Sequence, residues 1–211
     1  MRKTMMLLVT GIPTLAMGEE VTIAALGDSL TQGFGLVQED GFVPQLQAWL
    51  DERGIKARVI NAGVSGDTTA GGLARVGWTL TPDVDGMIVT LGGNDMLRGI
   101  DPGISRANVH GILEAAAEAE VEVLLVGMQA PGNFGPEYKM QFDALYPELA
   151  EEFGVLLAPD FFAGLDADSD PSVIRAYMQA DGIHPTAEGV VRIVDGLGPD
   201  VANLVERIQT Q

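Results

Sequence analysis

The sequence has 211 residues, with 12 Lys and Arg against 30 Asp and Glu, two His and no Cys. A chain of this length suits one domain, and 46% hydrophobic residues provide enough apolar material for a core, which excludes intrinsic disorder. The net charge of −18 argues against nucleic acid or an anionic membrane surface, and the absence of Cys excludes thiol nucleophiles, disulfides and thiolate metal sites.

The first 18 residues have the pattern of a signal peptide. Arg2 and Lys3 precede an apolar stretch that is too short to span a bilayer, and the small residues Ala16 and Gly18 precede a cleavage point before Glu19. We therefore predict a single mature domain over residues 19–211, exported to the periplasm or secreted, without stable membrane insertion. Initiation at Met17 is the alternative, and it would give a cytoplasmic protein.

The rest of the chain alternates short strands with helices and has no linker or repeat. The predicted strands, read from β-rich apolar runs, are Val21 to Leu26, Ala57 to Asn61, Gly86 to Leu91, Val121 to Met128 and Val155 to Pro159. The predicted helices, read mainly from apolar spacing, run from Phe42 to near Gly54, Thr69 to Leu80, Ser105 to Glu120, Glu137 to Phe153 and Thr186 to Ile208. This alternation predicts an α/β fold with a mostly parallel sheet covered by helices on both faces. Ligands of such folds bind at the carboxyl ends of the strands.

The turn after the first strand reads Gly27-Asp28-Ser29-Leu30. A Ser at a strand-to-helix turn projects its hydroxyl outward, and the helix N-terminus offers free N–H groups to a developing oxyanion. Ser29 is therefore a candidate nucleophile, although the residue type also suits a simple N-cap. The Gly-x-Ser-x-Gly elbow of α/β-hydrolases surrounds none of the five serines.

The turns after the second and third strands supply candidate oxyanion donors. Asn61-Ala62-Gly63 offers a backbone N–H at Gly63 that no side chain obstructs, and Gly92-Gly93-Asn94-Asp95 offers the Asn94 carboxamide. Together with the Ser29 N–H, these groups would provide three donors. Taken alone, each stretch is an ordinary Gly/Asn turn.

A Ser nucleophile needs a base, and the chain offers only two imidazoles. His110 lies inside a predicted Ala-rich helix without a motif, which indicates a surface residue. His184 lies in Asp181-Gly182-Ile183-His184-Pro185, where Asp181 is close enough to orient the ring. Local capping by this Asp and His is the alternative, but His184 is the better candidate base.

Other sites are disfavoured. Residues 166–170 resemble the start of a calcium loop, but Pro171 and Tyr177 occupy the positions where an EF-hand requires Gly and Glu, which indicates an acidic turn. No phosphate-binding loop follows a strand, and two separated His without Cys do not make a zinc site. We predict neither a cofactor nor a metal.

Four ordered motifs of the chain resemble those of the SGNH (GDSL) hydrolases. They are Gly27-Asp28-Ser29-Leu30, Gly63, Gly92-Gly93-Asn94-Asp95 and Asp181-Gly182-Ile183-His184. Three further stretches resemble the bacterial thioesterase, lysophospholipase and arylesterase branch: Val64 to Thr69, Asn94 to Gly99 and Asn133 to Tyr138. The resemblance implies an exported enzyme with a three-layer α/β/α sandwich, flavodoxin-like, with a five-stranded parallel sheet of order 2-1-3-4-5.

The resemblance also implies a serine ester hydrolase that cleaves a small-molecule ester or thioester. Ser29, His184 and Asp181 would form the triad, and Ser29, Gly63 and Asn94 the oxyanion hole. Apolar residues near these motifs are candidates for the acyl groove, although core packing is the alternative for some of them: Met96, Leu97, Met128, Phe134 and Ile183. A monomer is expected. A carbohydrate O-acetylesterase and a non-catalytic lipid- or sugar-binding protein remain the alternative functions.

Overall fold

The computed structural model describes residues 20–165 and 171–210, which contain a five-stranded sheet of order β2-β1-β3-β4-β5. All neighbouring strands pair in parallel. The strands are β1 (Val21–Gly27), β2 (Ala57–Gly63), β3 (Gly86–Thr90), β4 (Glu122–Val126) and β5 (Leu156–Ala158). The predicted fold class and strand order are confirmed.

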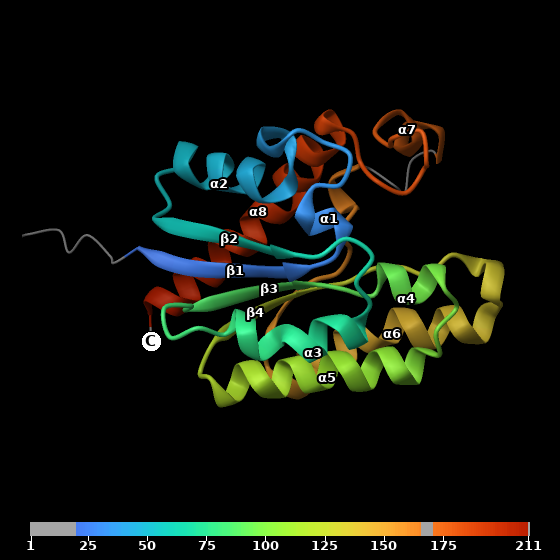
Figure 1. Cartoon of the computed structure of the whole chain (residues 1–211), viewed down its shortest axis with the longest axis horizontal. Coiled ribbons are helices and arrows are strands. Elements are labelled where there is room, and N and C mark those ends of the chain that lie inside the picture. The colour runs from blue at the N-terminus through green and yellow to red at the C-terminus, as the bar shows by residue number, and fades with distance from the viewer. Residues whose placement is uncertain (1–19, 166–170, 211) are drawn as a thin grey trace, which may run out of the picture.

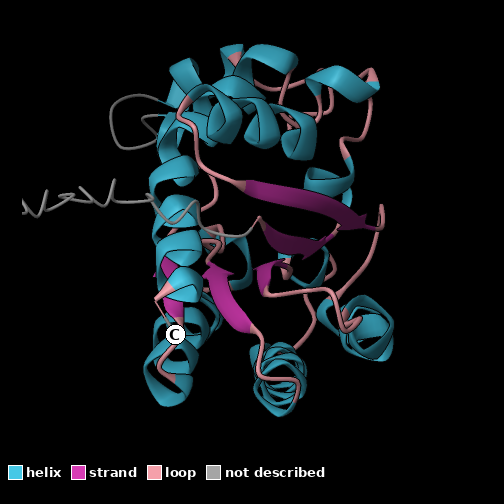
Figure 2. Cartoon of the chain, turned by 90° about the vertical axis from the view of Figure 1, so that its left-hand side faces the viewer, coloured by secondary structure: helices cyan, strands magenta, loops and turns pink. Residues whose placement is uncertain are grey.

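Helices cover both faces of this sheet (Figures 1 and 2). One layer consists of α2 (Phe42–Glu52) and α8 (Ala187–Gln209), and the other of α3 (Thr69–Thr79), α5 (Pro102–Glu118) and α6 (Pro136–Phe153). The double covering explains why the central strands are largely apolar, since a parallel sheet is buried on both faces. All seven residues of β1 are buried.

The long helix α8 illustrates how sequence spacing becomes packing. Its buried apolar positions recur at intervals of three and four residues, which places them on one stripe facing the sheet: Val190, Ile193, Val194, Leu197, Val201, Leu204 and Val205. The helix begins where the Thr186 hydroxyl accepts a hydrogen bond from the Gly189 N–H. No helix in the described ranges is both long enough and apolar enough to cross a membrane.

The predicted strands and long helices are present, with ends shifted by a few residues. The largest shift is at α5, which begins at Pro102 because Asp101 caps it and Pro suits the first helical turn. The short helices α4 (Gly93–Leu97) and α7 (Pro171–Ala176) were not predicted, because so few residues carry no periodic pattern.

Candidate active site

Ser29 stands at the carboxyl end of β1, as the first residue of the short helix α1 (Ser29–Gln32). The turn is tight at Gly27, where a Cβ atom would lie 2.0 Å from the Thr31 hydroxyl oxygen. Asp28 caps α1 by accepting a hydrogen bond of 3.0 Å from the Leu30 N–H. Ser29 is therefore not its own N-cap, and its N–H has no acceptor among the described residues.

The imidazole of His184 lies between Ser29 and Asp181. The distance from His184 Nε2 to Ser29 Oγ is 2.8 Å, and that from His184 Nδ1 to Asp181 Oδ2 is 2.7 Å. The other carboxylate oxygen of Asp181 accepts hydrogen bonds from the backbone N–H groups of Ile183 and His184. These contacts bring Ser29 together with His184, 155 positions later in the sequence, and with Asp181 of the same loop as His184.

Contacts on both sides fix the loop that carries His184. An antiparallel bridge between Met178 and Pro185 closes this loop. The Gln179 carboxamide donates 2.9 Å hydrogen bonds to the carbonyl oxygens of Pro185 and Phe34, which joins the loop to the segment after α1. The Phe34 ring lies 4.5 Å from the imidazole, centroid to centroid. Asp181 and Phe34 both contact the imidazole that lies against Ser29.

Two carboxylates near the hydroxyl have opposite pKa shifts. The hydrogen bonds from the His184 side chain and from two backbone N–H groups lower the pKa of Asp181 to about 2. Burial raises the pKa of Asp28, against the opposing hydrogen bonds from Leu30 and Asn94. Asp181 is therefore a charged partner for the imidazole at neutral pH and on mild acidification.

Asn94 lies on α4, at the carboxyl end of β3. Its side-chain Nδ2 donates a 3.1 Å hydrogen bond to Asp28 Oδ2, which leaves the second amide proton for another acceptor. The next residue, Asp95, is fully buried and accepts hydrogen bonds from the Thr69 backbone N–H and hydroxyl and from the Ser105 hydroxyl. Asp95 thereby ties α4 to the start of α3.

The Gly63 N–H, which the sequence predicts as an oxyanion donor, already has an acceptor in the fold. It donates to Asn61 Oδ1 at 2.9 Å, and the Gly63 Cα packs so closely on α1 that a Cβ would lie 2.4 Å from the Gln32 nitrogen. Gly66, three residues later, lines the cavity beside Ser29 and has a φ of +82°, and its N–H has no acceptor among the described residues. Sequence reasoning missed Gly66, although the residue lies in the quoted Val64 to Thr69 stretch.

A cavity of about 730 Å³ opens beside these groups. Ser29, Asn94 and His184 line part of it, and much of the remaining wall is apolar: Leu30, Phe34, Met96, Leu97, Met128, Pro131, Phe162, Ile174, Met178 and Ile183. Of the predicted groove residues, Phe134 alone is absent from this wall. It packs instead against the Tyr138 ring, at 5.0 Å, and over the space left by Gly99.

The second imidazole, His110, lies in the layer formed by α5 and α6. It pairs with Glu114 and Glu152 at 3.3 Å each and packs edge-on against the Phe153 ring. No group of three or more His, Asp or Glu within residues 20–165 and 171–210 is arranged to hold a metal ion. The acidic stretch 166–170 and the predicted signal peptide lie outside the described residues.

Comparisons with known proteins show which family the chain is similar to. The model of the GDSL-like Lipase/Acylhydrolase family matches residues 25–191. Esterase TesA of Pseudomonas aeruginosa is 36% identical over 185 residues, which cover 87% of this chain and 89% of that protein. Thioesterase 1/protease 1/lysophospholipase L1 of Escherichia coli K12 is 35% identical over 185 residues, which cover 87% of this chain and 85% of that protein. The crystal structure of AlinE4, an SGNH-hydrolase family esterase, is similar at a TM-score of 0.71 with 43% identity, covering 89% of this chain and 98% of that one.

Proposed function

The chain belongs to the GDSL-like lipase/acylhydrolase family and is a serine ester hydrolase, and we propose that Ser29, His184 and Asp181 are its catalytic triad. The observation that carries this proposal is the continuous pair of hydrogen bonds from Ser29 Oγ through the imidazole to Asp181. A hydroxyl, a base and an orienting carboxylate in this order are what acyl transfer requires.

In the proposed mechanism, Ser29 Oγ attacks the ester carbonyl while His184 Nε2 takes its proton. Asp181, which stays ionised, accepts the Nδ1–H bond and stabilises the imidazolium that forms. The imidazolium then protonates the departing alcohol or thiol, and the carbonyl re-forms as an acyl-enzyme on Ser29. Water, deprotonated by His184, attacks this ester, releases the carboxylic acid and restores the hydroxyl.

We assign the oxyanion hole to the N–H groups of Ser29 and Gly66 and the side-chain amide of Asn94. The free N–H groups of Ser29 and Gly66 and the orientation of Asn94 by Asp28 support this set, with Gly66 in place of Gly63. Each such donor typically contributes about 3 kcal/mol to transition-state stabilisation.

The cavity supports an acyl chain as the group that is recognised. Its wall is largely apolar beyond the polar groups around Ser29, and Met96, Leu97 and Ile183 contribute to it. Apolar clefts of this kind gain affinity from the area that they remove from water, at about 25 cal/mol per Å². Relatives named esterase, thioesterase and lysophospholipase fit a broad acyl specificity. An acetylated sugar offers little apolar surface to such a wall.

We also propose that residues 1–18 direct export and that residues 19–211 act as a monomer. The positive start and short apolar stretch of the sequence support export. Size-exclusion chromatography with light scattering and N-terminal sequencing of the secreted protein test the two statements separately.

The substrate proposal is tested with p-nitrophenyl esters from acetyl to palmitoyl, beside a lysophospholipid, an acyl thioester and an acetylated xylan. We expect activity that rises with acyl length beyond acetyl and is lost in Ser29→Ala. Activity confined to acetyl groups on the sugar would contradict the substrate proposal. Activity of folded Ser29→Ala within a few fold of the wild type would contradict the assignment of the nucleophile.

A further inference from the structure

A single guanidinium connects three segments at the carboxyl end of the sheet. Arg75 lies on the second turn of α3. Its Nη2 donates to the Gly27 carbonyl at 2.8 Å, its Nη1 to the Ala62 carbonyl at 2.7 Å, and its Nε to Asp67 Oδ2 at 2.6 Å. These acceptors belong to the end of β1, the end of β2 and the turn that follows β2.

Two of these contacts, with Gly27 and with Asp67, lie close in sequence to the proposed oxyanion donors. Gly27 is separated from Ser29 by Asp28 alone, and Asp67 directly follows Gly66. β1 and β2 also pair along their length, and beyond their ends the Val64 N–H donates to the Gly27 carbonyl at 3.0 Å and the Ser65 hydroxyl to Gln32 Oε1 at 2.7 Å. The Gly66 carbonyl accepts a 2.9 Å hydrogen bond from Arg98. To these contacts Arg75 adds a side-chain link from Asp67, next to Gly66, to the carbonyl of Gly27, two residues before Ser29.

The surroundings make this link strong and specific. The side chains of Arg75 and Asp67 are only 22% and 17% exposed, so water screens the pair weakly. Gly71 admits the Asp67 carboxylate to this place, since a Cβ there would lie 2.1 Å from Asp67 Oδ1. The planar fork of Arg reaches three acceptors at fixed angles, which the single ammonium of Lys cannot do.

We propose that Arg75 is a positioning residue, which holds the Ser29 and Gly66 N–H groups at the separation that one oxyanion requires. This inference rests on the proposed function. Arg75 is not among the residues that line the cavity, so it acts through the two turns and not by touching the substrate.

The inference predicts a particular kinetic signature. Misplaced donors weaken binding of the tetrahedral oxyanion more than binding of the planar ester, because only the oxyanion needs both donors at once. Loss of the link should therefore lower kcat, while the apolar wall, built from other side chains, continues to set KM.

The test compares Arg75→Lys and Arg75→Gln with Arg58→Lys. Arg58 lies on β2, at the amino end of the β1–β2 pair whose carboxyl end Arg75 contacts; it contacts Asp83 and Thr22 there and serves as the matched control. The measurements are kcat and KM on p-nitrophenyl butyrate, and inhibition by octylboronic acid, which forms a tetrahedral adduct with Ser, and by octanol, which only fills the cavity.

For Arg75→Lys we expect kcat to fall by about 10- to 100-fold, with a parallel loss of affinity for octylboronic acid. KM and octanol inhibition should stay within about threefold of the wild type, and Arg58→Lys should leave all four values unchanged. For Arg75→Gln we expect kcat to fall by about 100-fold or more.

Folded Arg75→Lys with kcat within about twofold of the wild type would overturn the inference. So would an equal loss of boronate and octanol binding, because that pattern indicates general damage to the site.

If neither Arg75 variant folds, Asp67→Asn weakens one contact only. It should still lower kcat and boronate affinity together, and unchanged values overturn the inference. Ser29→Ala in the same assay separates the two proposals, since activity retained there contradicts the nucleophile whatever Arg75 does.

Discussion

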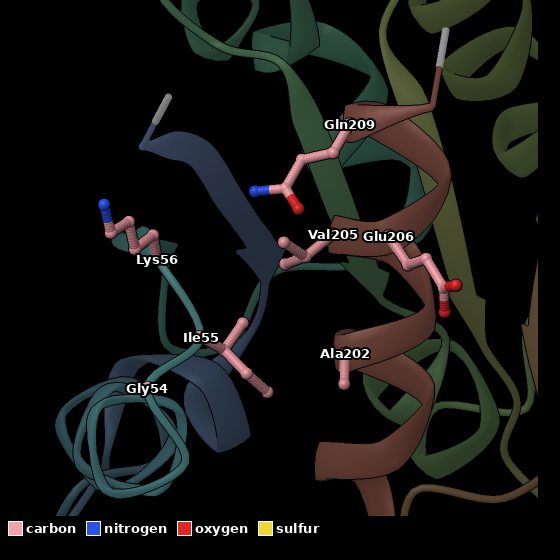
Figure 3. Close-up of a pocket in the computed structure, with 7 residues that line it drawn as sticks. All are labelled: Gly54, Ile55, Lys56, Ala202, Val205, Glu206 and Gln209. Carbon is pink, nitrogen blue, oxygen red and sulfur yellow. The ribbon is translucent and has the colours of Figure 1, made fainter. Parts of the chain in front are cut away.

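The sheet has a hollow at each end, and the two hollows differ in what their polar groups do. At the carboxyl end, Ser29, His184, Asp181, Asn94 and Asp28 are joined by hydrogen bonds beside a cavity of about 730 Å³. At the amino end, a smaller cavity of about 450 Å³ lies where the loop of Gly54, Ile55 and Lys56 faces α8 (Figure 3).

The polar side chains of the second hollow are not organised in this way. Its wall on α8 is formed by Ala202, Val205, Glu206 and Gln209. The side chains of Lys56, Glu206 and Gln209 make no hydrogen bond or ion pair with any part of the chain that the structure describes. A hollow alone is therefore not a site, and what distinguishes the carboxyl end is a set of groups that orient one another.

The sharpest test of this difference compares the two imidazoles. His184→Ala removes the proposed base and should lower kcat by about 10⁴-fold or more. His110→Ala, between Glu114 and Glu152 on the helical layer, should leave kcat unchanged. Rates on p-nitrophenyl butyrate measure both, with circular dichroism to verify folding. Equal losses of kcat in the two variants would contradict the distinction between the two imidazoles.

The next largest effect should come from Asp181→Asn. The amide cannot hold the imidazole in the required tautomer, so kcat should fall by about 10³- to 10⁴-fold.

Because the pKa of Asp181 in the folded protein is about 2, below its ordinary 3.8, its contribution to stability is present above pH 4 and disappears as the pH falls towards 2. Asp181 should thus stay ionised on mild acidification, and it should not be the cause of any activity that the wild type loses above about pH 4. A wild-type pH profile of kcat/KM, with unfolding followed in parallel, measures this. Loss of stability above pH 4 in the wild type but not in Asp181→Asn would contradict it.

Asn94→Ala removes one proposed oxyanion donor and should lower kcat by about 10²- to 10³-fold with little change in KM. Steady-state kinetics on the same ester measures the split. A rise in KM at constant kcat would show that Asn94 binds the ground state and would exclude it from the oxyanion hole.

Asp28→Asn should separate stability from activity. Burial raises the pKa of this carboxyl, so its charge is costly in the folded state, and neutral Asn should raise the thermal midpoint. The new amide nitrogen would face Asn94 Nδ2 in place of an acceptor, so kcat should fall by about 10-fold. Calorimetry and kinetics measure the two changes, and a lower midpoint would contradict the first.

The smallest effect should come from the amino end. Glu206→Gln in the second hollow should leave kcat within about twofold of the wild type and shift the thermal midpoint little, because this exposed carboxylate has no partner among the described residues. A large fall in kcat would mean that the second hollow affects catalysis at the carboxyl end of the sheet.

Much of the fold was predictable because local and global signals agree in this chain. The strand Val21–Gly27 is apolar apart from Thr22 because both its faces are buried, and α8 keeps an apolar stripe along its whole length. The candidate site could be proposed from the sequence wherever the residue type itself limits the choice. Ser, Asn, Asp and His each have a function that few residue types can perform, and only two His were available.

The remaining features depend on contacts that no local pattern records. Our proposal of Gly66 in place of Gly63 as an oxyanion donor rests on Asn61 Oδ1, which accepts the Gly63 N–H. Phe134 turns away from the cavity because Gly99 leaves room for its ring. Arg75 reaches a carbonyl 48 positions earlier in the sequence. Such pairings follow from the packed sheet and could be seen only once the strands were in place.

Covalent labelling with a fluorophosphonate tests the central claim most directly. The intact mass of the wild type should rise by one adduct, and peptide mapping should locate it on Ser29. Ser29→Ala should show no adduct, and His184→Ala should react far more slowly, since the hydroxyl loses its base. An adduct on any of the other four serines, or undiminished labelling of Ser29→Ala, would contradict the assignment of the nucleophile.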